Sequence, residues 1–198
     1  MDDPTCPSAA PARRGTTTLI AGCMFAGKTS ELLDRLRCYP SNRRIAFKHV
    51  IDNRYRTDAI VSHDGDHLPA VTVTDAGQIP GKVVDGIEIA AIEEAHFFGT
   101  PLLNAIEALT ARGVNVLVTG LELDTWGRPF PVMQRLAERA DERTVKRPVC
   151  ARCGAPADHS QRLTPIVDGR LVGGSESYEP RCANCWHPPP EPAPAEPQ

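Results

Sequence analysis

The sequence contains no long apolar run, no secretory signal and no excess of positive charge, and each absence narrows what it can do. No apolar stretch approaches the ~20 residues that span a bilayer. The acidic N-terminus has no apolar segment of the kind that a secretory signal requires. We therefore expect a cytoplasmic protein that does not bind membranes. The formal net charge of −3 argues against a nucleic-acid partner, because neutralising phosphates requires clustered lysine and arginine.

Cysteine, in contrast, is abundant, with seven in the chain. In a cytosolic protein such cysteines indicate metal binding or catalysis rather than disulfides. The hydrophobic fraction of 41% is enough for a core. The length of 198 residues fits one domain with a small appendage.

Residues 22–29 fit the pattern G-x-x-x-x-G-K-[ST]. An apolar, β-branched run at 16–21 predicts a buried strand before this loop, and leucines with helical spacing predict a helix over 30–37 after it. Strand, glycine loop and helix are the context of a phosphate-binding P-loop, although a chance match at a glycine-rich turn is the alternative. Lys28 would reach the β- and γ-phosphates of ATP, and the Thr29 hydroxyl would ligate Mg²⁺. The residues expected to bind ATP here are Gly22, Cys23, Met24, Phe25, Ala26, Gly27, Lys28 and Thr29.

Strands and helices alternate along the first three quarters of the chain. Beyond the first strand and helix, the sequence predicts strands at 44–48, 70–73, 87–92 and 114–119, helices at 101–112 and 131–142, and loops at 52–56 and 62–67. This alternation predicts an α/β fold, a mostly parallel sheet flanked by helices. Ligands bind such sheets at the carboxyl ends of the strands.

Glu93 and Glu94 directly follow one apolar strand. Beside a P-loop, one such acid can hold Mg²⁺ and the other can act as general base on an attacking hydroxyl. The alternative is a pair of solvated acids at a strand end. Phe97 and Phe98 would either line a pocket for a flat ligand or pack in the core.

Two C-x-x-C pairs near the C-terminus predict a tetrahedral Zn²⁺ site. Four unpaired thiols or a redox motif are the alternatives, and His187 competes with the last cysteine as fourth ligand. The expected metal ligands are Cys150, Cys153, Cys182 and Cys185.

Together these segments resemble the type II thymidine kinases, the zinc-containing family of bacterial and animal cytosol. The resemblance covers about residues 16–186. It is carried by M-F-A-G-K-T-S-E-L at 24–32, D-N-R-Y at 52–55, S-H-D-G at 62–65, E-E-A-H-F-F at 93–98, G-L-E followed by G-R-P-F within 120–130, and V-G-G-S-E-S-Y at 172–178.

This resemblance implies ATP-dependent phosphorylation of the 5′-hydroxyl of thymidine, and of deoxyuridine, by a homotetramer that uses ATP, Mg²⁺ and Zn²⁺. Glu94 would be the general base and Arg54 would stabilise the transferring phosphoryl group. Glu93 would be the Mg²⁺-side acid, with Ala95 and His96 completing the ATP and Mg²⁺ set. A loop at 160–178 would close over the base. The residues expected to bind the nucleoside are Met24, Asp52, Phe97, Leu121, Thr125, Phe130, Ser160, Val172, Gly173, Gly174 and Tyr178.

The chain departs from the family pattern at a few positions. Glu93 and Glu122 stand in place of aspartate, and His96 stands in place of glutamine. Residues 125–126 read Thr-Trp where the family has Phe-Arg, which we expect to widen the base pocket. A catalytically impaired homologue is therefore one alternative. Another is a P-loop ATPase whose zinc module binds nucleic acid or protein, although the balanced charges of 149–187 disfavour nucleic acid.

The expected organisation has four parts. They are a flexible tail at 1–14, a P-loop α/β kinase domain at 15–148, a zinc-binding module at 149–187, and a proline-rich disordered tail at 188–198.

Overall fold

The computed structural model describes residues 13–52, 56–166 and 172–191. Its centre is a six-stranded sheet in which every pair of neighbouring strands is parallel, as the alternating sequence predicts. In spatial order its strands are β5 (Val71–Val73), β2 (Arg44–His49), β6 (Ile89–Ile92), β7 (Asn115–Gly120), β1 (Thr17–Gly22) and β8 (Glu142–Lys146).

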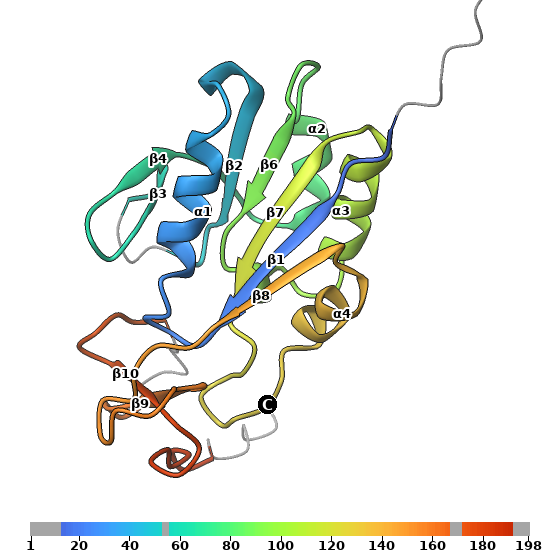
Figure 1. Cartoon of the computed structure of the whole chain (residues 1–198). Helices are drawn as coiled ribbons and strands as arrows, with labels where there is room; N and C mark the ends of the chain where they lie inside the picture. Colours follow the sequence, from blue (N-terminus) through green and yellow to red (C-terminus); the bar gives the residue numbers. More distant parts are fainter. Residues whose placement is uncertain (1–12, 53–55, 167–171, 192–198) are drawn as a thin grey trace, which may run out of the picture.

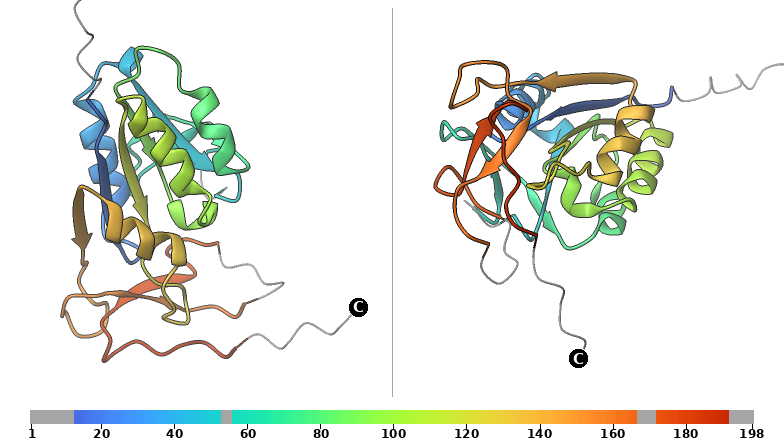
Figure 2. Two further views of the ribbon diagram at one scale, coloured as in Figure 1. Left: turned by 90° about the vertical axis from the view of Figure 1, so that its right-hand side faces the viewer. Right: turned by 90° about the horizontal axis from the view of Figure 1, so that it is seen from below.

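Helices cover both faces of this sheet (Figure 1, Figure 2). The α-helices are α1 (Lys28–Arg37), α2 (Ile79–Lys82), α3 (Leu102–Ala111) and α4 (Pro131–Arg139). Short 3₁₀ helices are η1 (Ser41–Arg43), η2 (Ala76–Gln78) and η3 (Ala95–Phe98).

The alternation of side chains along the strands divides the core into two layers. On β1, Leu19 packs with α2, α3 and α4, whereas its neighbour Ile20 packs with α1. On β7, Val116 belongs to the layer on the side of α2, α3 and α4, and its neighbour Leu117 belongs to the layer on the side of α1. Strands buried on both faces are the reason why the sequence shows continuous apolar runs here rather than alternation.

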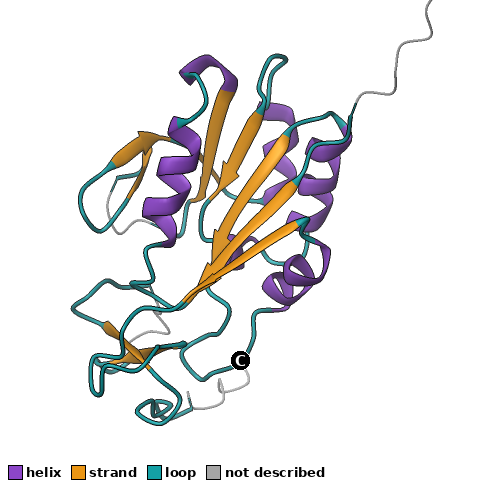
Figure 3. Cartoon of the chain, viewed as in Figure 1, coloured by secondary structure: helices purple, strands orange, loops and turns teal. Residues whose placement is uncertain are grey.

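Two small antiparallel pairs lie outside the sheet. The hairpin of β3 (Ala59–Val61) and β4 (His67–Pro69) packs beside α1, where Ile60 joins the α1 core layer. The pair of β9 (His159–Arg162) and β10 (Tyr178–Arg181) lies beyond the ends toward which the strand arrows point (Figure 3). Residues 149–166 and 172–191, the described part of the cysteine module, therefore sit at the edge where a parallel sheet binds ligands.

The structure corrects two expectations from the sequence. The helix expected at 131–142 ends at Arg139, because the Ala140 backbone is extended and the Asp141 carboxylate accepts the N–H of Thr17 at 2.7 Å. The chain then enters β8, the edge strand beside β1. The stretch read as a loop at 62–67 reaches β4, whose pairing partner β3 was also missed. Within the described ranges, no helix has the length and apolar character needed to cross a bilayer.

Candidate functional site

Residues 22–29 join β1 to α1, and their backbone conformation requires glycine at two positions. Gly22 has φ +143°, and a Cβ there would lie 2.3 Å from the carbonyl oxygen of Lys146 on β8. Gly27 has φ +70° and caps the N-terminus of α1. This loop therefore has the geometry of a phosphate cradle, with N–H groups at the start of a helix.

The reactive side chains of the loop are held by short hydrogen bonds. Lys28 is 7% exposed, and its Nζ donates to the carbonyl oxygen of Cys23 at 2.7 Å. The Thr29 hydroxyl donates to Oε1 of Glu93 at 2.8 Å. Glu93 follows β6, so this contact joins the start of α1 to the end of β6, which is separated from β1 by β7. Hydroxyl and carboxylate oxygens are the ligands that Mg²⁺ prefers.

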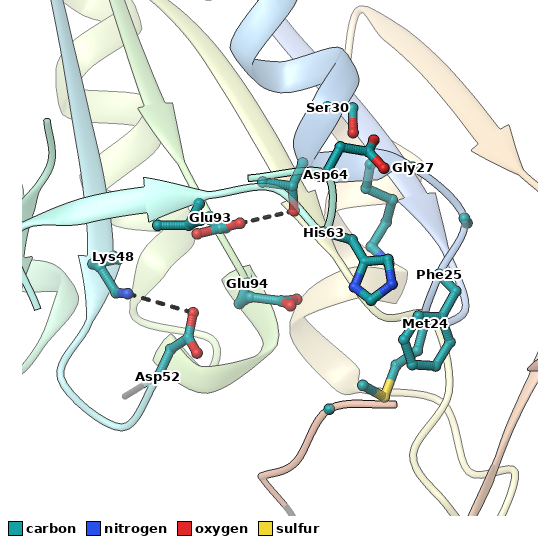
Figure 4. A pocket seen from close by; sticks show the side chains of 15 residues that line it. Met24, Phe25, Gly27, Ser30, Lys48, Asp52, His63, Asp64, Glu93 and Glu94 are labelled. Atoms are coloured by element: carbon teal, nitrogen blue, oxygen red, sulfur yellow. Dashed lines mark hydrogen bonds and ion pairs between the residues drawn. The ribbon is translucent and has the colours of Figure 1, made fainter. Parts of the chain in front are cut away.

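Glu94 lies next to this pair and is 8% exposed. Its φ is +51°, and among the described non-glycine residues only Glu94 and Phe25 have positive φ. Both residues line the same pocket, which we call the phosphate pocket (Figure 4). Backbone strain of this kind is typical of functional sites.

A buried ion pair forms another wall of the phosphate pocket (Figure 4). Nζ of Lys48 lies 3.8 Å from Oδ2 of Asp52, and both side chains are buried. The same ammonium donates to the carbonyl oxygens of Arg56 at 2.8 Å and Ala59 at 3.3 Å. Lys48 therefore ties together both ends of the loop between β2 and β3. Arg54, expected to act on the phosphoryl group, lies outside the described residues.

The turn between β3 and β4 reaches the phosphate pocket. His63 makes an edge-to-face contact with Phe25, with ring centroids 5.8 Å apart. The S-H-D-G motif could have identified this turn as part of the site. The lining residues that the sequence analysis did not select are Ser30, Lys48, Val61, His63 and Asp64.

Carboxylates outnumber ammonium groups in the described lining of the phosphate pocket. The charged residues are Asp52, Asp64, Glu93 and Glu94 against Lys28 and Lys48. A polyphosphate bound among these side chains therefore requires compensating cations.

A second pocket, the apolar pocket, adjoins the first. Met24 and Glu94 line both. Except for Asp52 and Gly174, which line the phosphate pocket, every residue expected to bind the nucleoside lines the apolar pocket. The lining residues are Met24, Glu94, His96, Phe97, Leu121, Leu123, Asp124, Thr125, Phe130, Ser160, Val172, Gly173 and Tyr178.

His96 lies in the apolar pocket rather than with the ATP and Mg²⁺ set. Its ring centroid is 4.2 Å from that of Phe97 and 4.8 Å from that of Phe130. Its Nδ1 accepts the Leu121 N–H at 3.3 Å and lies 3.6 Å from Oε2 of Glu94. The neutral imidazole consequently carries its proton on Nε2. Ala95, expected in the same set, is fully buried against the sheet and lines neither pocket.

A tight turn at residues 123–129 forms one wall of the apolar pocket. The Asp124 carboxylate accepts the N–H groups of Trp126 and Arg128, both at 2.8 Å. Thr125 is 6% exposed and lines the pocket. The Trp126 indole instead donates to the carbonyl oxygen of Pro190 at 3.4 Å. Trp126 is absent from the pocket lining, so its ring does not take the place of the missing phenylalanine.

The four cysteines of the C-x-x-C pairs converge. All four Sγ atoms, from Cys150, Cys153, Cys182 and Cys185, lie within 4.8 Å of one another. Thiolates at a Zn–S distance of about 2.3 Å in a tetrahedron are about 3.8 Å apart, so this donor set fits zinc. Within the described residues no other group of at least three such side chains occurs, which places the last cysteine, rather than His187, in the ligand set.

The thiol of Cys150 ionises readily, whereas hydrogen bonds with the Cys153 and Cys182 side chains raise the pKa of Cys185 to about 12. Burial opposes ionisation of Cys150, but N–H groups of Cys182, Arg152 and Cys153 outweigh it and lower the pKa of Cys150 to about 6. Gly154, which follows the first pair, has φ +76°, as a tight knuckle requires.

The P-loop and the cysteine module touch directly. The Met24 N–H donates to the Ser160 hydroxyl at 3.0 Å. Cys23 packs against Cys150 and Cys182, and its Sγ lies 3.7 Å from the carbonyl oxygen of Ala157. Burial raises the pKa of Cys23 to about 11, so this thiol is neutral at physiological pH.

The chain was compared with protein-family models and with solved structures. A family model described as "Thymidine kinase" matches residues 15–186. Among solved structures, the ATPase DotB of Legionella pneumophila is similar with 15% sequence identity and a TM-score of 0.39. The match covers 64% of this chain and 34% of DotB, so the chain spans about a third of that protein.

Proposed function

This chain belongs to the thymidine kinase family, and we propose that it transfers the γ-phosphoryl group of ATP to the 5′-hydroxyl of thymidine, forming dTMP for nucleotide salvage. Its four-cysteine cluster fits the zinc-containing type II branch. The observation that carries the proposal is that Met24 and Glu94 line both the phosphate pocket and the apolar pocket. A carboxylate at this boundary can reach the 5′-hydroxyl of a nucleoside whose base fills the apolar pocket, while the donor phosphate of ATP lies in the phosphate pocket.

In this mechanism the P-loop amides and Lys28 bind the β- and γ-phosphates. Glu94 accepts the proton of the 5′-hydroxyl as its oxygen forms a bond to the γ-phosphorus. The bond from that phosphorus to the bridging oxygen breaks, and ADP leaves. Thr29 and Glu93 would hold Mg²⁺, which when bound neutralises the phosphate charge in this carboxylate-rich pocket. Positioning and charge stabilisation are sufficient, and no covalent intermediate is needed.

Base selection depends on the apolar pocket. Thymine and uracil present an acceptor, an N–H donor and a second acceptor along one edge, and cytosine and the purines do not. A mismatched edge leaves buried polar groups unpaired, which discriminates strongly, whereas the thymine methyl is worth only ~1–3 kcal/mol. We therefore expect thymidine to be preferred to deoxyuridine, with deoxycytidine and the purine deoxynucleosides far behind.

The proposal also includes a bound metal, an oligomeric state and a cellular location. The four cysteines would hold Zn²⁺, which when bound fixes the two knuckles beneath the loop that carries Val172 and Gly173. The resemblance to type II enzymes supports a cytoplasmic homotetramer without a nucleic-acid partner.

An assay with ATP labelled at the γ-position, run across the natural deoxynucleosides and deoxyuridine, tests the proposal. We expect label in dTMP and, less efficiently, in dUMP. Comparable kcat/KM for deoxycytidine and thymidine would overturn the base assignment. Phosphate release that needs no nucleoside would instead favour a P-loop ATPase, and absence of any turnover would favour an impaired homologue.

A further inference from the structure

The segment that follows the last cysteine pair, residues 186–191, lies against the 123–129 turn. We call this segment the clamp. Trp186 packs on the backbone of Gly127, where a Cβ would lie 2.7 Å from Cη2 of the indole. Gly127 has φ +77°, so its conformation and the space around it both favour glycine. Farther along the clamp, Pro190 accepts the Trp126 indole N–H, and Glu191 forms an ion pair with Arg128.

The clamp is also fixed to the cysteine module. The Trp186 indole stacks on His159 of β9, with centroids 4.4 Å apart and an interplanar angle of 27°. The backbone of His187 exchanges two hydrogen bonds with the Gln161 side chain, both of 2.8 Å. The clamp therefore joins β9 to the turn, and both elements contribute residues to the apolar pocket, Ser160 from one and Thr125 from the other.

The 123–129 turn has few other attachments at its tip. The Asp124 carboxylate and carbonyl shape it from within. In the described part of the chain, the hydrogen bonds that residues 124–128 make to other segments all go to Pro190 and Glu191. The internal bonds form the turn, and the clamp contacts hold it against β9, so that loss of these contacts lets the turn move and its internal bonds open more often.

We propose that Trp186 is a positioning residue that holds the 123–129 turn in place and thereby sets the affinity of the apolar pocket for the nucleoside. This inference rests on the proposed function for the identity of the ligand. Without the indole, the turn gains freedom that binding must then remove, and this lowers affinity. The phosphate pocket has no residue from the clamp or the turn. The effect should therefore be confined to the nucleoside.

The first experiment compares Trp186→Ala with the wild-type chain by steady-state kinetics and by calorimetric titration with thymidine. We expect KM and Kd for thymidine to rise at least about tenfold, equivalent to about 1.4 kcal/mol, while KM for ATP and kcat stay close to the wild-type values. Trp186→Phe should recover most of the loss, because a phenyl ring can still stack on His159 and cover Gly127. Val149→Ala, a substitution of an exposed apolar residue of the same module outside the 160–178 loop, is the matched control.

Two truncated chains test the role of the clamp without substituting Trp186. A chain ending at His187 loses the contacts of Pro190 and Glu191 and should also bind thymidine more weakly. A chain ending at Glu191 retains every contact described above and should match the full chain. The zinc content of each variant is measured, so that damage to the neighbouring Cys185 is detected.

Amide hydrogen exchange separates failure of this inference from failure of the proposed function. The reporters are the N–H groups of Trp126, Gly127 and Arg128, which hydrogen-bond to Asp124. If the wild-type chain binds no thymidine, the proposed function fails, and faster exchange at these amides in Trp186→Ala still supports the clamp. The positioning role of Trp186 is overturned if exchange at these amides is the same in Trp186→Ala and the wild type. It is also overturned if KM for ATP and KM for thymidine rise equally in variants that retain zinc.

Discussion

Glu94 combines a strained backbone with a position between two pockets. A left-handed conformation costs a residue with a Cβ about 1–2 kcal/mol, yet φ at Glu94 is +51°. The peptide is held there by the Phe97 N–H, which donates to the Glu94 carbonyl oxygen at 3.0 Å. The carboxylate of neighbouring Glu93 has a different partner, because it accepts a hydrogen bond from the Thr29 hydroxyl. The two acids therefore differ in environment although they are adjacent in sequence.

Replacing each acid by its amide tests this division of roles. We expect Glu94→Gln to lower kcat by roughly 10²–10⁴-fold with little change in thymidine binding, because the amide keeps the shape but cannot accept the proton. Glu93→Gln should instead raise the Mg²⁺ concentration needed for half-maximal rate. Steady-state kinetics with Mg²⁺ titration measures both. A large kcat loss in Glu93→Gln alone would reverse the assignment.

Lys28→Ala should abolish phosphoryl transfer and leave the fold intact. Its ammonium is buried and bonded to the loop it serves, so the substitution removes the charge that would neutralise the phosphates. Circular dichroism and the radiolabel assay together make the measurement. A folded Lys28→Ala protein with full activity would contradict the P-loop assignment.

Central and edge elements differ in how far the sequence predicts them. Strands β1, β6 and β7 are apolar on both faces, and their runs were recognised with small errors at the ends. The edge strand β8 reads Glu-Arg-Thr-Val-Lys, without an apolar run, and only its pairing with β1 makes it a strand. The strands of the β3–β4 hairpin have three residues each, too few to show a pattern, so β3 received no prediction and the start of β4 was taken for loop.

At the element level, the junction of β1, the P-loop and β8 gives a stability prediction. Gly22→Ala forces a Cβ to within 2.3 Å of the Lys146 carbonyl oxygen at a positive φ, so we expect a loss of at least about 2 kcal/mol in the free energy of unfolding. Gly81→Ala in α2 is the matched control, because a Cβ there meets nothing within 4 Å, and it should be neutral or stabilising. Urea denaturation compares them. Equal stability of the two variants would contradict this prediction and would show that β8 can shift to make room for the added Cβ.

Across the whole molecule, the sequence predicted which strand ends would meet but not how the distant segments pack. Glu94 and Leu121 follow neighbouring strands of a parallel sheet, so their convergence at one edge follows from topology. The contact of Trp186 with Gly127 has no such rule behind it, since it depends on where the cysteine module docks. The family resemblance placed His96 with the ATP and Mg²⁺ residues, whereas its ring packs toward Phe130 in the apolar pocket.

Metal removal should loosen the molecule in one part only. We expect one Zn²⁺ per chain, and Cys153→Ser should accelerate hydrogen exchange in β9 and β10 while β1 and β7 stay protected, because the metal ties the module rather than the sheet. Metal analysis and exchange mass spectrometry make the measurement. Freshly purified protein without zinc, or uniform loss of protection, would count against this prediction.

The chain contains two tryptophans, Trp126 and Trp186, and both lie where the turn meets the clamp. Intrinsic emission excited at the red edge of the indole band therefore arises entirely from the junction of the turn and the clamp, behind one wall of the apolar pocket. Trp186 stacks on the His159 imidazole and Trp126 lies 5.7 Å from the Arg128 guanidinium, so a shift of the turn alters the surroundings of both fluorophores. The protein thus carries its own optical probe, and a nucleoside titration can be followed by emission without any label.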